Sequence, residues 1–129
     1  MSDAQVARTW VRYGLPGLSG WLEGNIRLGD PTDGGGLESL RVRLSRCRFW
    51  LERLTLPAPL PALEPLRASF IATFRLLDLF TAARIKALEE PGRSAAIETD
   101  LRSRLPELQQ RVELLTAEVQ RTVALFAEE

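Results

Sequence analysis

The sequence predicts an all-α fold, an antiparallel bundle of three long helices with a short helix at the N-terminus. Three stretches repeat their apolar residues at spacings of 3 and 4, the period of a helix face that packs on other helices. The period-two alternation that indicates strands is absent. A chain of 129 residues is the size of one domain, so we expect a single core.

The N-terminal part of this domain, residues 1–36, is predicted to hold the short helix and a glycine-rich segment. Asp3 can cap the short helix, and Gly14 with Pro16 ends it. The following segment is too apolar for a linker, yet each glycine inside a helix costs about 1 kcal/mol relative to alanine. Its glycines therefore do not favour a regular helix, and we expect it to fold onto another part of the molecule. Residues 37–129 are predicted to form the helical bundle.

The next predicted helix, residues 37–56, has two apolar faces. One is an a/d repeat formed by Leu37, Leu40, Leu44, Cys47, Leu51 and Leu54. The other carries Val42, Phe49 and Leu56, about 170° from the middle of the first, so one neighbouring helix cannot cover both. We expect residues 10–28 to cover the second face, either within one chain or by exchange between two copies. A different protein is the third candidate.

The third long segment, from about residue 62 to 90, follows a connector with prolines at positions 57, 59, 61 and 65. Its apolar residues follow an eleven-residue period, which favours a nearly straight helix. Further apolar residues widen this surface, so we expect it to be the central and most buried helix. Pro91 and Gly92 end it.

The last predicted helix begins near Ser94 and reaches almost to the C-terminus. Pro106 would remove one backbone hydrogen bond, so we expect a kink or a break between Arg102 and Leu105. Acidic residues outnumber arginines in residues 89–129, which offsets the arginine-rich helix at residues 37–56.

The chain carries few groups capable of catalysis. It has no histidine and one cysteine, which excludes histidine-dependent catalysis, histidine-containing zinc or di-iron sites and a CxxC pair. Neither GxxxxGK[ST] nor GxGxxG occurs, so no phosphate-binding loop is expected. We predict no catalytic residue, no cofactor and no metal site, and hence a protein that is not an enzyme.

Composition also narrows the choice of partner and compartment. The 17 basic and 17 acidic residues balance, which disfavours nucleic acid and anionic membranes as partners. No apolar stretch approaches the roughly 18 residues of a membrane span, and the N-terminus lacks the apolar core of a secretory signal. The single cysteine, Cys47, lies on the apolar a/d face of its predicted helix and can form no disulfide within the chain. Together these features predict a cytoplasmic protein.

Aromatic residues and arginines dominate the energetics of protein interfaces. In this chain several of them lie outside the best heptad faces. The predicted interaction surface consists of Trp10, Tyr13, Trp21, Arg41, Val42, Arg48, Phe49, Trp50 and Leu56. We predict a protein-interaction module that acts through helix packing as an adaptor, assembly or regulatory subunit, in a homodimer or a hetero-complex.

Two alternatives remain open. The first is a small-molecule sensor or an enzyme with an internal pocket. A buried arginine or carboxylate without a protein partner, facing a cavity among Phe70, Phe74 and Phe80, would favour it. The second is a weak nucleic-acid binder, in which arginines of residues 37–56 contact phosphates while Phe49 and its neighbouring tryptophan stack on bases.

Overall fold

The computed structural model describes residues 2–27, 36–53 and 60–127. Within these ranges the chain forms helices and no strand, which confirms the all-α prediction. The α-helices are α1 (Asp3–Tyr13), α2 (Leu15–Arg27), α3 (Leu37–Arg53), α4 (Glu64–Glu89) and α5 (Ser94–Ala127), and the short 3-10 helices are η1 (Pro61–Leu63) and η2 (Pro91–Arg93).

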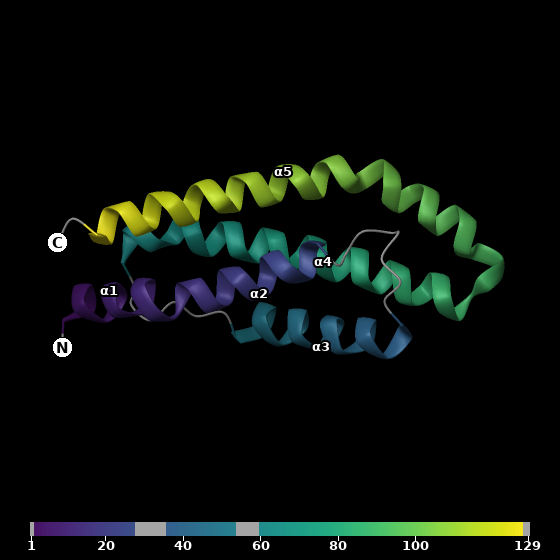
Figure 1. Ribbon diagram of the computed structural model, residues 1–129, viewed down its shortest axis with the longest axis horizontal. Helices are drawn as coiled ribbons and strands as arrows, with labels where there is room; N and C mark the ends of the chain where they lie inside the picture. Colours follow the sequence, from purple (N-terminus) through teal and green to yellow (C-terminus); the bar gives the residue numbers. More distant parts are fainter. Residues whose placement is uncertain (1, 28–35, 54–59, 128–129) are drawn as a thin grey trace.

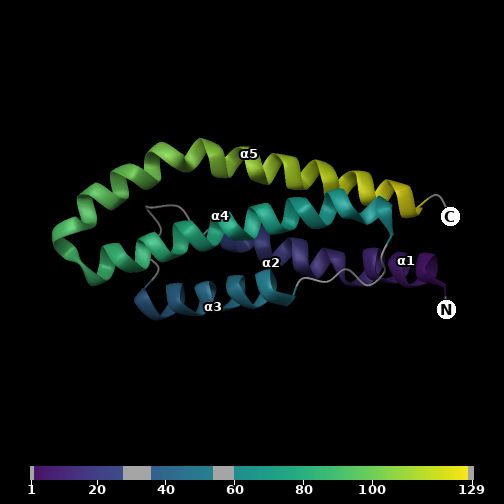
Figure 2. The same ribbon diagram turned by 180° about the vertical axis from the view of Figure 1, so that it is seen from behind.

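The three long helices form a layer with α4 in the middle, α3 on one side and α5 on the other (Figure 1). α1 and α2 follow each other almost end to end. α2 passes in front of α4 in Figure 1 and behind it in Figure 2, so the N-terminal helices cover one face of the layer. Among the described residues, no further helix lies on the opposite face.

α4 is the most buried helix, as its wide apolar surface predicts. Phe70, Phe74 and Leu77 on its core side are fully buried. They belong to a cluster that takes buried residues from all five α-helices, so the N-terminal helices share one core with the rest of the chain. A second cluster lies towards η2 and takes its buried residues from α4 and α5.

The glycine-rich segment forms a regular helix, α2, although its glycines do not favour one. Pro16 lies in the first turn of α2, where a missing backbone N–H costs little. Leu15, Leu18 and Leu22 form a buried stripe along the helix, at spacings of 3 and 4. The glycines of α2 lie away from that stripe, with nothing near the position of an added Cβ. Burial of the leucines therefore offsets the low helix propensity of the glycines.

The junction between α1 and α2 depends on the absence of a side chain at Gly14. The Gly14 N–H donates to the Trp10 carbonyl at 2.7 Å and ends α1. A Cβ at this position would lie 2.7 Å from Cδ1 and 2.9 Å from Nε1 of Trp10. The indole of Trp10 therefore occupies the space that any larger residue at this junction would need.

The N-terminal cap of α1 is Ser2, one residue before the expected Asp3. Its hydroxyl accepts a hydrogen bond from the Gln5 N–H at 3.2 Å, and the Gln5 side chain accepts one from the Ser2 N–H at 2.9 Å. This reciprocal pair is a capping box. Asp3 lies in the first turn of α1, where its negative charge interacts favourably with the positive end of the helix dipole.

α5 remains one continuous helix across Pro106, so the expectation of a break is wrong. The ribbon of α5 arches about midway along its length in Figure 1. Pro106 and Arg102, four residues earlier, are both exposed. Water can therefore reach the carbonyl that the proline ring leaves without its helical partner.

Gly14→Ala should destabilise the protein by about 1–3 kcal/mol, because its methyl group meets the indole of Trp10. Gly20→Ala is the matched control in an open part of α2, and it should stabilise the protein by about 0.5–1 kcal/mol. Urea denaturation measures both. Equal effects of the two substitutions would show that the contact between Gly14 and Trp10 does not form.

Candidate protein-interaction surface

The three tryptophans of the chain, which come from three different helices, line one hollow of about 410 Å³. We call this the tryptophan hollow. It is lined by Trp10, Gly14, Gly17, Leu18, Trp21, Arg46 and Trp50. The structure thus brings together the three predicted tryptophans. It adds Gly14, Gly17, Leu18 and Arg46, which are not among the predicted surface residues.

Two of these tryptophans are held by the same phenylalanine. The ring of Phe74 stacks with Trp21 at a centroid distance of 6.0 Å and with Trp50 at 6.4 Å. Phe74 is fully buried, whereas both tryptophans remain partly exposed. Their inner parts contribute to the core, and their outer parts form the wall of the hollow.

Among the described residues, the second apolar face of α3 stays about half exposed and is not covered by another helix. Val42 and Phe49 are each 47% exposed, and Leu56 lies outside the described residues. The expectation that residues 10–28 cover this row within one chain is therefore wrong. Trp50 lies about 100° around the helix from Phe49 and stacks on Phe74 of α4. Trp50 also lines one hollow with Leu18 and Trp21 of α2, so α2 lies on that side of α3 instead.

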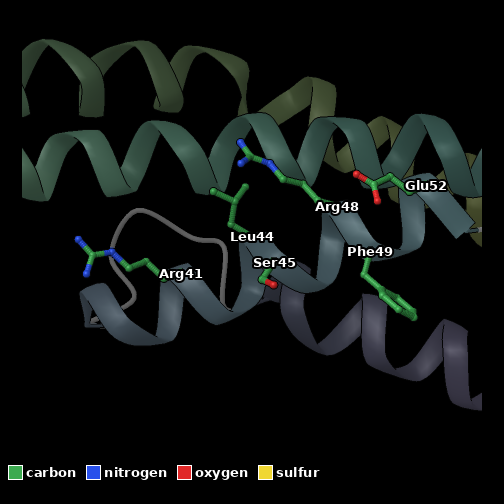
Figure 3. A pocket seen from close by; sticks show the side chains of 6 residues that line it. All are labelled: Arg41, Leu44, Ser45, Arg48, Phe49 and Glu52. Carbon is green, nitrogen blue, oxygen red and sulfur yellow. The ribbon is translucent and has the colours of Figure 1, made fainter.

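Two shallow hollows flank the uncovered row on the outward side of α3. One, of about 430 Å³, is drawn in Figure 3, where Leu44 and Arg48 point towards α4 and Phe49 points away from it. The other, of about 400 Å³, lies beside Val42. We call this surface the α3 outer face, and it consists of Glu38, Arg41, Val42, Ser45, Arg46, Arg48, Phe49 and Glu52.

The α3 outer face continues into the tryptophan hollow. Arg46 lines the hollow beside Val42 and also the tryptophan hollow. Phe49 contacts Trp50 edge to face, with ring centroids 5.7 Å apart. Ser45 and Arg46 could have been found from the sequence, since both lie between Val42 and Phe49 on the helix surface.

The arginines of this surface differ in their partners. Arg41 pairs with Glu89 at 3.8 Å, and Arg48 pairs with Asp78 at 3.6 Å. Both arginine side chains are more than half exposed, so each pair contributes only about 0–1 kcal/mol while it connects α3 to α4. Arg46 is exposed and makes no ion pair within the part of the chain that the structure describes.

Arg43 lies inside the protein and not on an exposed flank of α3. It is 6% exposed, so its guanidinium cannot lie along a phosphate backbone. Arg41 and Arg48 already face carboxylates of α4. These positions weaken the nucleic-acid alternative, because Arg43 is buried and Arg41 and Arg48 are locally neutralised.

Tyr13 does not join the other predicted surface residues. It is 72% exposed at the end of α1, and it lines neither the tryptophan hollow nor the hollows of the α3 outer face. The guanidinium of Arg12 lies 5.4 Å from its ring centroid, an exposed cation–π contact within α1.

The cavity expected for a sensor or an enzyme is filled by side chains. Phe70 and Phe74 are fully buried with ring centroids 6.4 Å apart, and Phe80 is buried in the neighbouring cluster. The buried arginines Arg43 and Arg84 both interact with other groups of the chain. The described residues include no group of three or more histidine, cysteine or acidic side chains that could hold a metal ion.

Cys47 is fully buried on the core side of α3. Burial, together with the nearby carboxylate of Asp78, raises the pKa of its thiol to about 12, while the charge of Arg43 opposes the change. The thiol is therefore protonated at neutral pH and acts as a small apolar side chain.

Comparison of the chain with protein-family models, curated proteins and solved structures returned no match. Among the described helices, none combines the length and apolar character needed to cross a bilayer.

Cys47→Ala should change the pH dependence of stability above pH 9. In the unfolded chain the thiol ionises near 9.0, whereas in the folded protein it stays protonated up to about 12. Within this window the unfolded state binds fewer protons, so the free energy of unfolding of the parent falls with rising pH relative to that of the variant. Below this window the difference between the two proteins should be constant.

Urea denaturation of both proteins at matched pH values on either side of 9 measures this difference. A difference that stays constant at higher pH would show that the pKa of Cys47 is not raised by folding.

Proposed function

We propose that this chain is a non-enzymatic protein-interaction module, an antiparallel helical bundle that acts in the cytoplasm as an adaptor, assembly or regulatory subunit. The observation that carries the proposal is the continuity of the α3 outer face with the tryptophan hollow. Val42 and Phe49 are each 47% exposed beside the partly exposed tryptophans. Large apolar side chains that remain exposed on one contiguous surface are typical of protein docking sites.

The composition of this surface supports protein binding over other activities. Tryptophan and arginine are the residue types that most often carry the binding energy of interfaces. The hollows offer places where side chains of a partner can be enclosed, and Ser45 between Val42 and Phe49 allows a close approach. A helix with apolar residues at spacings of 3 and 4 would match this surface.

The charge of α3 indicates that the partner of the α3 outer face is a different protein and not a second copy of this chain. Arginines outnumber acidic residues on this helix, and Arg46 at its centre makes no ion pair within the described residues. A two-fold axis between residues 45 and 46 would place Val42 against Phe49 of the other copy, but it would also bring the two Arg46 side chains close together. A partner with carboxylates beside an apolar ridge avoids this repulsion.

The proposal is tested by Phe49→Glu, with Leu114→Glu as the matched control. Both residues are exposed to a similar extent, and Leu114 lies on α5, away from the α3 outer face. Phe49→Glu should reduce the recovery of a cross-linked partner at least about tenfold, because it places a charge in the apolar centre of the surface. Leu114→Glu should leave the recovery unchanged.

The measurement is quantitative mass spectrometry of proteins cross-linked to the tagged chain in its native cells, together with light scattering of the purified chain. A dimer that Phe49→Glu separates into monomers would identify the partner as a second copy. Equal recovery with both variants would contradict the proposal.

A further inference from the structure

A cavity of about 560 Å³ lies between α1, the first turn of α2 and the end of α5. The end of α5 is far in sequence from α1 and α2, and it meets α1 at the end of the molecule that holds both termini (Figure 1). We call this the α1–α5 cavity. It is lined by Arg8, Val11, Arg12, Pro16, Val123, Phe126 and Ala127.

The lining has one apolar part and one basic part. Arg8 and Arg12 are one helical turn apart on α1, so they lie on the same side of that helix. Every other lining residue within the described part of the chain is apolar. The hollow beside Phe49, by contrast, is lined mainly by polar and charged residues, including Glu52.

The walls of the α1–α5 cavity come from well-packed residues. Val11 is 6% exposed and belongs to the main core cluster. Phe126 is partly buried and packs against both that cluster and the small cluster of Ala7 and Leu63. Val123 is 44% exposed and lies at the outer side of the cavity. A ligand could therefore reach the apolar walls from solvent past Val123.

The dimensions of the α1–α5 cavity favour a small molecule as its occupant and not a helix of another protein. The volume lies within the range of about 300–1,000 Å³ that is usual for small-molecule sites. On α5 the lining runs only from residue 123 to residue 127, which is about one turn of helix. A docked helix would need contacts over several turns.

We propose that the α1–α5 cavity binds a small amphiphilic carboxylate. Its apolar chain lies between Val11 and Phe126, and its carboxylate is held by Arg12, on the side of the cavity that Arg8 also lines. Arginine suits this task because its planar fork donates two parallel hydrogen bonds to a carboxylate. This site is separate from the α3 outer face, so binding here goes beyond the proposed association with a protein.

The test is isothermal titration of the full chain with decanoate. We expect saturable binding of one decanoate per chain. Decyltrimethylammonium has the same chain with a positive head group, and it should bind at least about tenfold more weakly because it faces two arginines. Acetate, which lacks the chain, should not bind measurably. Equal affinity for decanoate and decyltrimethylammonium would overturn the proposal.

Two glutamate substitutions on α5 provide a matched pair. Val123→Glu places a carboxylate at the cavity, and Leu125→Glu places the same charge at a residue that is 47% exposed and does not line it. Val123→Glu should weaken decanoate binding at least about tenfold, and Leu125→Glu should leave it unchanged. Equal loss in both variants, or loss in neither, would contradict the assignment of this cavity.

Arg12→Gln tests the head-group contact and should weaken decanoate binding about tenfold, as the loss of a charge-assisted hydrogen bond does. Circular dichroism of each variant verifies that it folds. If a variant does not fold, decanoate is added to the parent protein and the methyl resonances of Val11 and Val123 are followed by NMR. These resonances should shift, and unchanged resonances would overturn the proposal. Phe49→Glu should bind decanoate normally, which separates this site from the proposed protein surface.

Discussion

The stacking of aromatic rings on Phe74 is the interaction on which the arrangement of the other helices depends. Phe74 is fully buried in α4, and its ring lies 6.0 Å from Trp21 of α2 and 6.4 Å from Trp50 of α3. Because one ring holds both tryptophans, α2 and α3 are brought onto the same part of α4. Pairs of this kind add about 0.5–1.5 kcal/mol each to the burial of their area.

This stack also determines which surface remains open. α2 lies on the side of α3 that carries Trp50, so it leaves Val42 and Phe49 exposed on the α3 outer face. Gly14 gives Trp10 the space to complete the hollow beside the other tryptophans. The packing that closes the core therefore also creates the surface that we propose for a partner.

Heptad spacing was enough to predict the long helices and the buried side of α3, where Leu40 and Cys47 are fully buried. Helix propensity did not indicate α2, because propensity is local while the burial of Leu22 depends on residues distant in sequence. Heptad spacing failed for the neighbour of Val42 and Phe49, since periodicity defines helix faces without specifying what packs on them. The α1–α5 cavity joins residues more than 100 positions apart, such as Val11 and Phe126, and no local pattern indicates it.

Nuclear Overhauser contacts between the rings of Trp21 and Phe74 are the most direct test of whether Phe74 holds α2 on α4. A mixture of isotope-labelled and unlabelled chains allows contacts within one chain to be separated from contacts between two chains. The account predicts strong contacts between these rings within one chain, at the edge distances that a 6.0 Å centroid separation implies, and none between chains. Absence of these contacts, or their appearance only between chains, would contradict it.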